Sequence, residues 1–513
     1  MQINVLEYFK GGALARCPRK VAVIDQNRRY TFEEIERFAK NCAARILERT
    51  DVIRQPIAVF LPKSVETIVA DLGILYSGNF YANLDLKSPP ERLKAILQNL
   101  NASSIITSAE HAAALRAVGV PEGQLLLVEA AMTADATHDN AVLQARVDQV
   151  IDTDPLCIIH TSGSTGIPKG VALSHRGTID FMDWVFHRLG LDGSEVIGSL
   201  SPFYFDIYTL ELCLCLAKGA TLVIIPEQCA AFPAKLLDFM VAQAISFIFW
   251  VPTIMVNVAN QNLLGKWKLE ALRKVFFAGE VFPTKHLNYW RRHLPGALFV
   301  NLYGPIEISV DCTYFVVDRE MADDERLPIG FPCRNTDILI LNEQNRLAQV
   351  DEPGELCVRG SSLALGYWNN PERTAQAFVQ NPLNQHYPEL IYRTGDLVYR
   401  NSRGEILFIG RKDFQIKHLG YRIELGEIEH AVLQLAGIRN CCVVYHHGRK
   451  EIHLFFESDA EMSAAVMREG LGAFLPKYML PTVFHHMPQL PRNPNGKIDR
   501  QELIRRADTV VSG

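Results

Sequence analysis

Hydrophobic positions along the chain follow two spacings: short apolar runs, and longer stretches with apolar residues every three or four positions. The short runs are rich in β-branched and aromatic residues and are bounded by turn residues, which predicts buried strands. Examples are residues 56–61, 103–107, 220–225, 246–251 and 297–302. Because these runs alternate with helical stretches, the sequence predicts an α/β fold.

The pattern changes after residue 350 to shorter, glycine-punctuated runs such as GELCVRG (354–360) and GEILFIG (404–410). Such runs predict antiparallel hairpins. From about Phe414 onward the chain has its own helix (GEIEHAVLQLAG) and strands (CCVVYHH and EIHLFFE). We therefore expect one domain over residues 1–412 and a second over 413–513.

Composition narrows the class of partner. The chain has 513 residues, 48% of them hydrophobic, and 52 basic against 57 acidic residues give a net charge of -5. No positive excess points to nucleic acid or to an anionic membrane, so neither is expected as a partner. The apolar stretches are too short or too interrupted to span a bilayer, and the first residues lack a signal-peptide core. We expect a cytoplasmic protein.

The cysteines and histidines do not predict a structural metal site. The 11 cysteines are irregularly placed and form no paired CxxC spacing, so buried reduced thiols are expected. The pairs His446–His447 and His485–His486 have no acidic or cysteine partner at metal-ligand spacing.

The stretch TSGSTGIPKG, residues 161–170, carries glycines, hydroxyl side chains and Lys169 directly after the apolar run PLCIIH. It matches neither GxxxxGK[ST] nor GxGxxG. Glycines allow close approach of the backbone to an anion, and hydroxyls and a lysine supply donors and charge. From these residues alone, a phosphate-binding loop and a flexible surface loop both remain open.

Further motifs follow this loop in a fixed order. They are FDIYTLEL (205–212), NLYGPIE (301–307), GELCVRG (354–360), YRTGDL (392–397), GRKDFQIKHLGYRIELGEIE (410–429) and NPNGKIDR (493–500). The ordered set resembles the adenylate-forming superfamily, which contains acyl-CoA synthetases, luciferases and the adenylation domains of nonribosomal peptide synthetases. The resemblance implies a large N-terminal domain of stacked mixed sheets and helices, and a small mobile α+β C-terminal domain.

The resemblance also implies ATP and Mg²⁺ as cofactors, and a first step in which a substrate carboxylate attacks the α-phosphorus of ATP. Glu307 would hold magnesium, Asp396 and Arg411 would bind the ribose region, and Lys497 would be the main catalytic residue. Without the resemblance, Lys497 is most simply a solvated turn residue. The remaining implied ATP-binding residues are Thr161, Ser162, Gly163, Ser164, Thr165, Gly166, Lys169, Gly279, Asn301, Tyr303 and Gly304.

Asp206 lies where amino-acid-activating members carry the aspartate that pairs with the substrate ammonium group. The alternative role for Asp206 is a helix N-cap before IYTLELCLCL. The implied substrate pocket consists of Asp206, Ile207, Leu210, Phe249, Phe276, Ala278, Leu302, Val310 and Asp311. Its two phenylalanines favour proline or another small aliphatic amino acid. A pocket-facing Asp311 would instead suit a basic substrate such as ornithine.

Two motifs depart from the usual family pattern. Ile306 replaces the threonine of YGPTE and cannot donate a hydroxyl hydrogen bond to phosphate. The segment LYSGNFYANLDL, residues 75–86, is also looser than the usual form.

The second step is expected to transfer the aminoacyl group to the phosphopantetheine thiol of a separate carrier protein. Only 16 residues follow Lys497, which suggests a free-standing ligase similar to D-alanine carrier protein ligases. The small domain would rotate about Asp413 and bring Gly420 and Tyr421 to the site in place of Lys497. A coenzyme A ligase acting on a small carboxylic acid is the alternative, and a non-catalytic binding protein is a more distant one.

Overall fold

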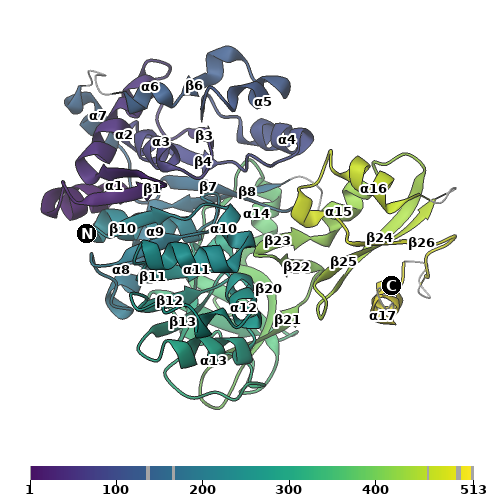
Figure 1. Cartoon of the computed structure of the whole chain (residues 1–513). Coiled ribbons are helices and arrows are strands. Elements are labelled where there is room, and N and C mark those ends of the chain that lie inside the picture. Colours follow the sequence, from purple (N-terminus) through teal and green to yellow (C-terminus); the bar gives the residue numbers. More distant parts are fainter. Residues whose placement is uncertain (1, 134–138, 164–167, 459–461, 493–497, 510–513) are drawn as a thin grey trace.

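The computed structural model describes residues 2–133, 139–163, 168–458, 462–492 and 498–509 (Figure 1). Strands and helices alternate along most of these ranges, as the hydrophobic pattern predicts. Within the described ranges no helix is both long and apolar enough to cross a membrane.

The largest sheet has nine strands among the described residues. Its central strands are parallel, and the edge strands β2, β14 and β15 are antiparallel to their neighbours. In spatial order they are β15 (Phe331–Pro332), β14 (Thr313–Val316), β13 (Leu298–Tyr303), β12 (Lys274–Phe277), β11 (Phe247–Trp250), β9 (Val196–Ser199), β10 (Thr221–Ile224), β1 (Val21–Asp25) and β2 (Arg28–Thr31). The predicted runs 220–225, 246–251 and 297–302 therefore lie in this sheet.

A second sheet has seven strands in the described part of the chain. In spatial order they are β18 (Gly366–Tyr367), β8 (Lys169–Ser174), β7 (Pro155–Thr161), β4 (Phe80–Asn83), β3 (Pro56–Phe60), β5 (Ile105–Thr107) and β6 (Leu125–Leu127). The strands from β7 to β6 pair in parallel, whereas β7 and β8 form an antiparallel hairpin. That hairpin contains the TSGSTGIPKG loop.

A third, antiparallel sheet follows in the chain, as the glycine-punctuated runs predict. It consists of β16 (Thr336–Leu341), β17 (Gly354–Gly360), β20 (Leu390–Arg400), β19 (Phe378–Gln380) and β21 (Ile406–Arg411).

Helices α3 (Val65–Tyr76), α8 (His175–Arg188) and α9 (Ile207–Lys218) pack between the two large sheets. Helix α3 contacts β1 of one sheet and β3 and β4 of the other, and α9 contacts β9, β10 and α8. Nearly every residue of α3 and α9 is consequently buried. The other helices up to residue 377 are α1 (Val5–Phe9), α2 (Phe32–Leu47), α4 (Pro90–Leu100), α5 (Ala112–Ala117), α6 (Glu129–Met132), α7 (Asn140–Val147), α10 (Gln228–Ala231), α11 (Pro233–Ala242), α12 (Pro252–Asn260), α13 (Thr284–His293) and α14 (Pro371–Ala377).

The chain after Asp413 builds smaller sheets and its own apolar cores, drawn in yellow-green at the right of Figure 1. Strands β22 (Gln415–His418) and β23 (Tyr421–Glu424) form a hairpin, and β24 (Ile438–His446), β25 (Glu451–Ser458) and β26 (Val483–His486) form a sheet. The helices are α15 (Leu425–Val432), α16 (Ala464–Leu471) and α17 (Arg500–Thr509). The β22–β23 hairpin faces the large sheets and contributes to the site.

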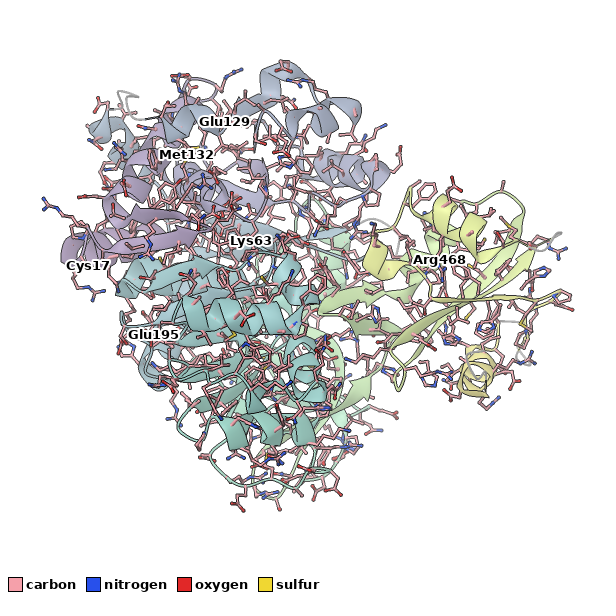
Figure 2. The ribbon with its side chains drawn as sticks, in the orientation of Figure 1. Cys17, Lys63, Glu129, Met132, Glu195 and Arg468 are labelled. Atoms are coloured by element: carbon pink, nitrogen blue, oxygen red, sulfur yellow. The ribbon has the colours of Figure 1, made fainter. Side chains whose placement is uncertain are left out.

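All eleven cysteines fall within the described ranges and are free thiols. Ten are buried, and Cys17, at the N-terminal edge in Figure 2, is partly exposed. No group of three or more His, Cys, Asp or Glu side chains that could hold a metal ion occurs among the described residues. The free and mostly buried thiols agree with the sequence prediction.

Candidate functional site

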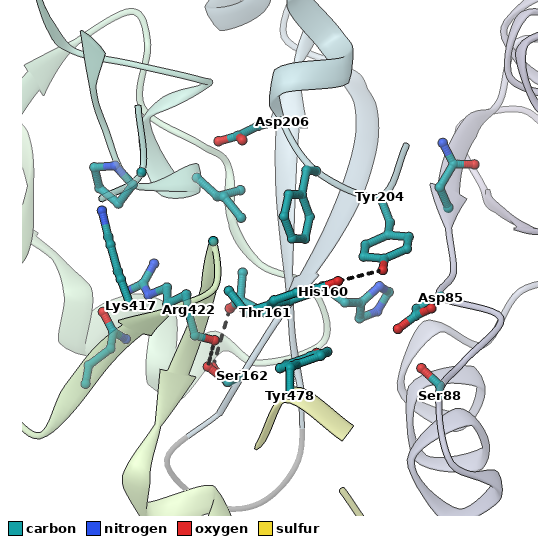
Figure 3. Close-up of a pocket in the computed structure, with 18 of the residues that line it drawn as sticks. Asp85, Ser88, His160, Thr161, Ser162, Tyr204, Asp206, Lys417, Arg422 and Tyr478 are labelled. Carbon is teal, nitrogen blue, oxygen red and sulfur yellow. Dashed lines mark hydrogen bonds between the residues drawn. The ribbon is translucent and has the colours of Figure 1, made fainter. Parts of the chain in front are cut away.

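The TSGSTGIPKG loop joins the ends of β7 and β8, so that Thr161 lies opposite Lys169 in the antiparallel register. Thr161 and Ser162 line a cavity between the large sheets and the β22–β23 hairpin (Figure 3). Lys169 is directed toward the ring of Tyr367, with its Nζ 5.4 Å from the ring centre. Burial lowers the pKa of Lys169, and the nearby Arg422 charge lowers it further.

The β22–β23 hairpin and the start of α15 bind this loop directly. The Ser162 hydroxyl donates to the backbone oxygen of Arg422 at 2.7 Å, and the Gly163 amide donates to Oε2 of Glu427 at 3.0 Å. Lys169 Nζ lies 3.5 Å from Oε1 of Glu424. Carboxylates of the C-terminal segment thus contact the donors that the sequence assigns to phosphate.

Glu427 has a second partner on the other side of the interface. Its Oε1 accepts a hydrogen bond from Nη1 of Arg92 in α4, and the two side chains are 2% and 9% exposed. An ion pair this deeply buried is costly to break by removing one partner. The ion pair between Arg92 and Glu427 therefore holds α15 against α4.

Glu307 lies in a 3₁₀ turn directly after β13 and is fully buried. Its Oε1 accepts from the Tyr367 hydroxyl at 2.8 Å, and its Oε2 accepts from Nη1 of Arg422 at 2.7 Å. Burial alone would raise the pKa of Glu307, but the charges of Arg422 and Lys169 outweigh burial and lower the pKa to about 2. The carboxylate is therefore ionised at neutral pH.

Asp396, Arg411 and Tyr303 converge from three strands. Asp396 and Arg411 are register partners on β20 and β21, and Nη1 of Arg411 lies 2.6 Å from Oδ1 of Asp396. The Tyr303 hydroxyl donates to the other oxygen of Asp396. Arg411 also binds Asp413, with Nε 2.6 Å from Oδ1. Asp396, a predicted ribose-binding residue, and Asp413, the predicted hinge residue, therefore both bind the guanidinium group of Arg411.

Of the predicted ATP-binding residues Gly279, Asn301 and Gly304, only the two glycines line the cavity. An added Cβ at Gly304 would lie 2.5 Å from the Cα of Asp311, so only glycine fits there. The Asn301 side chain donates to the carbonyl of Pro328 at 2.7 Å.

The Gly420–Tyr421 face lies against the site. The Gly420 amide donates to Oε1 of Glu280 at 2.8 Å. The Tyr421 ring stacks on Tyr478 with centroids 3.6 Å apart, and its hydroxyl lies 3.5 Å from that of Tyr204. These three tyrosines line the cavity and are called the aromatic wall below; Tyr204 and Tyr478 are labelled in Figure 3.

Asp206 lines the same cavity at the start of α9. It occupies the N-cap position, yet its side chain makes no capping hydrogen bond. Burial raises the pKa of Asp206 to about 6. Lys417 of β22 also projects into the cavity (Figure 3), and burial lowers the pKa of its ammonium group. The cavity therefore holds a carboxylate and an ammonium group of opposite charge.

The other predicted pocket residues have little exposed surface. Each is at most 5% exposed, and none of them lines the open cavity. They are Ile207, Leu210, Phe249, Phe276, Ala278, Leu302, Val310 and Asp311. Of the predicted pocket set, only Asp206 therefore lines the cavity, and the others are buried.

Four predicted residues, Ser164, Thr165, Gly166 and Lys497, lie outside the described residues. Conversely, the sequence reasoning did not single out Lys417, Arg422, Glu427 or Arg92. The first three belong to the motif at 410–429 and were accessible from it. Arg92 carries no sequence signal, because its partner Glu427 is 335 residues away along the chain.

Comparisons with known proteins agree with this arrangement. A model of the family described as AMP-binding enzyme matches residues 12–368. Because the match covers more than half of the chain, the chain belongs to the AMP-binding enzymes, which are adenylate-forming and use ATP. It is similar to tyrocidine synthase 1 of Brevibacillus parabrevis, with 32% identity over 490 residues, 95% of this chain and 43% of that protein. The chain thus spans less than half of that relative.

Solved structures share the fold. The Vibrio cholerae adenylation domain AlmE, in complex with glycyl-adenosine-5'-phosphate, has a TM-score of 0.84 at 22% identity, covering 99% of this chain and 98% of that one. The o-succinylbenzoate CoA synthetase MenE of Bacillus subtilis has a TM-score of 0.84 at 19% identity, with 98% and 99% coverage. An artificially fused adenylation–PCP di-domain, NpsA-ThdA of Klebsiella oxytoca, has a TM-score of 0.81 at 22% identity, with 94% coverage of each chain.

Proposed function

We propose that this protein activates an amino acid with ATP, giving an aminoacyl adenylate and pyrophosphate. The observation that carries the proposal is Asp206, a carboxylate that lines the cavity and makes no capping hydrogen bond to helix α9. Such a carboxylate favours an ammonium group, because a bound cation offsets the cost of its burial. Simple carboxylic acids lack this group.

In the first step, one oxygen of the substrate carboxylate forms a bond to the α-phosphorus while the bond from phosphorus to the bridging oxygen breaks. The carboxylate is already ionised, so the protein must align reactants and neutralise charge. We assign Thr161, Ser162 and Lys169 to the β- and γ-phosphates, and Asp396 with Arg411 and Tyr303 to the ribose. Lys497, outside the described residues, would neutralise charge at the α-phosphate.

Glu307 fits a magnesium ion. It is a fully buried, ionised carboxylate beside the phosphate loop, and magnesium commonly takes one or two carboxylates and draws its other ligands from phosphate and water. When bound there, magnesium would neutralise phosphate charge. Arg422 holds one oxygen of Glu307 in the arrangement described here, so the hairpin would have to withdraw first.

In the second step we propose that the phosphopantetheine thiol of a carrier protein reaches the site along the wall of Tyr204, Tyr421 and Tyr478. The thiol loses its proton to solvent, the sulfur bonds to the acyl carbon, the bond from that carbon to the phosphate oxygen breaks, and AMP leaves. The Gly420–Tyr421 face at the cavity supports assigning the arrangement described here to this step. Residues 413–513 would act as a small domain hinged at Asp413, and the carrier would be a separate protein.

Amino-acid-dependent exchange of labelled pyrophosphate into ATP, run over a panel of amino acids, tests this function. Exchange with at least one amino acid is expected, with small aliphatic amino acids as the first candidates. The absence of exchange with all of them, alongside turnover of a simple acid with coenzyme A, would overturn the proposal.

A coenzyme A ligase is the second candidate, since MenE has the same TM-score as AlmE. Both classes form an acyl adenylate, so the acceptor distinguishes them. Offering the preloaded enzyme either coenzyme A or a phosphopantetheinylated carrier protein shows which thiol reacts faster.

A further inference from the structure

The β22–β23 hairpin closes in a tight turn of two residues. His418 and Tyr421 are register partners, so Leu419 and Gly420 alone form the turn, with φ of 53° and 83°. Positive φ at both positions is the pattern of a type I′ turn, and it is unfavourable for a residue as bulky as leucine. The Gly420 amide lies at this turn, outside the strand pairing, so an acceptor from elsewhere in the chain can bind it.

Glu280, directly after β12 and Gly279, supplies that acceptor. Its Oε1 accepts from the Gly420 amide at 2.8 Å. Its Oε2 accepts from the backbone amide of Thr253 at 2.9 Å and from the Thr253 hydroxyl. Thr253 is the second residue of α12, and a negative charge is favourable at the N-terminus of a helix. One carboxylate oxygen is thus held by the large domain, and the other holds the hairpin.

A second turn of the C-terminal segment reaches the same point. Lys450, between β24 and β25, has φ of 55°, which is uncommon for a residue other than glycine. Its Nζ donates to Oγ1 of Thr253 at 3.3 Å. The Thr253 hydroxyl therefore accepts from Lys450 while it donates to Glu280. We call Thr253, Glu280, Gly420 and Lys450 the docking latch.

The latch lies beside the reacting groups. In the part of the chain that the structure describes, Gly279 and Gly420 line the cavity, whereas Glu280 does not. We propose that Glu280 is a positioning residue for thioester formation, which acts by holding the Gly420–Tyr421 face at the cavity and takes no part in adenylate formation. This inference rests on the proposed two-step function and adds to it a residue that serves the second step alone.

The two partial reactions separate this role from a general structural one. A glutamine at position 280 has a single acceptor oxygen, so it cannot accept from both the Gly420 and the Thr253 amides. In Glu280→Gln, transfer from a preformed aminoacyl adenylate should slow by about 10-fold, because hydrogen bonds to a charged acceptor are the stronger ones. Pyrophosphate exchange should be retained. The matched control is Glu343→Gln, at an exposed glutamate after β16, which should change neither reaction.

Free pantetheine is the acceptor in this assay. It is the arm that carrier proteins and coenzyme A have in common, so the result does not depend on which of them is the natural acceptor. Single-turnover formation of the aminoacyl-pantetheine thioester gives the transfer rate.

Substitutions at Thr253 test the latch from the other side. Thr253→Ser keeps the hydroxyl that joins Glu280 and Lys450, and should transfer at the wild-type rate. Thr253→Val has nearly the same shape but no hydroxyl, and should slow transfer by about 3-fold with exchange retained. A variant that simply folded poorly would lose both partial reactions together.

Hydrogen–deuterium exchange of the resting protein tests the latch without any substrate. Peptides covering residues 415–424 should exchange about 10-fold faster in Glu280→Gln than in the wild type, since amide exchange follows local opening. Peptides from β17, residues 354–360, serve as the internal reference and should be unchanged.

Unchanged exchange at 415–424, or equal loss of both partial reactions in Glu280→Gln, would overturn the inference. A wild type that forms no adenylate with any amino acid would instead contradict the proposed function, and the deuterium measurement would still decide whether the latch exists.

Discussion

Nη1 of Arg422 lies 2.7 Å from Oε2 of Glu307, so a cation of the C-terminal segment holds the carboxylate that we assign to magnesium. The same segment places Glu427 on the Gly163 amide and Glu424 beside Lys169. Groups of the hairpin and of α15 thus engage the same partners that the first step needs. We infer that the hairpin and the polyphosphate of ATP occupy this loop at different times.

Arg422→Gln should shift the protein away from the docked arrangement. The magnesium concentration for half-maximal pyrophosphate exchange should fall, by about 10-fold if the docked state is the major one. Thioester formation should slow, because the β22–β23 hairpin loses the ion pair with Glu307 that keeps it docked. Titration of exchange with magnesium checks the first effect. Arg505→Gln, which breaks an exposed pair with Glu502, serves as the control and should change neither.

The buried pair between Arg92 and Glu427 should act as one unit. Arg92→Gln and Glu427→Gln should each slow transfer from a preformed adenylate by about 10²-fold, because removing one partner leaves a buried charge unpaired. The double substitution should cost much less than the product of the two. Single-turnover thioester formation measures this. If the free-energy losses of the two single variants add in the double variant, the two residues do not act together. Lys87→Gln, which removes an exposed ion pair with Glu227, is the control and should leave the transfer rate unchanged.

Gly420→Ala should impair docking of the hairpin specifically. Gly420 has φ of +83°, and an added Cβ would lie 3.1 Å from Cγ1 of Val251. Gly437→Ala is a matched control, with φ of +85° and nothing within 4 Å of its added Cβ. Both variants bear the left-handed backbone cost of about 1–2 kcal/mol. Thioester formation should fall in Gly420→Ala well beyond any loss in Gly437→Ala, with pyrophosphate exchange retained.

Amino acid binding should weaken at acid pH through Asp206. Burial raises the pKa of this carboxyl to about 6, so the group is ionised above that pH and neutral below it. KM for the amino acid should therefore rise about tenfold per unit as pH falls below 6. KM for ATP should lack this dependence. Asp206→Asn should raise KM for the amino acid at pH 7 and remove the increase of KM below pH 6. If KM still rises below pH 6 in this variant, the titrating group is not Asp206.

The sequence predicts the local elements of the fold better than their neighbours in space. Runs such as 246–251 and 297–302 form strands because β-branched and aromatic residues favour a buried sheet. The pairing of β1 with β10 places Val23 beside Leu222, and the Thr221 hydroxyl donates to the backbone oxygen of Val21, 200 positions away along the chain. No local pattern encodes such a pairing, since it depends on how the helices between the sheets pack.

The candidate site was predicted unevenly for a similar reason. Asp396, Arg411 and Tyr303 contact one another in the structure, and each belongs to a motif that the sequence analysis singled out. Arg92 was missed, since an arginine in an amphipathic helix is ordinarily solvated, and only the distant Glu427 gives it a role. Only the structure shows that Asp311 is buried and that its Oδ2 has no hydrogen-bond partner among the described residues.

The most direct test of the central claim compares each amino acid with its analogue lacking the ammonium group. Alanine against propionate, and serine against 3-hydroxypropionate, are suitable pairs for labelled pyrophosphate exchange. The account predicts exchange with an amino acid and at least about 100-fold less with its deaminated partner, because Asp206 then lacks its cation. Equal exchange for both members of each pair, or exchange with the simple acids alone, would contradict it.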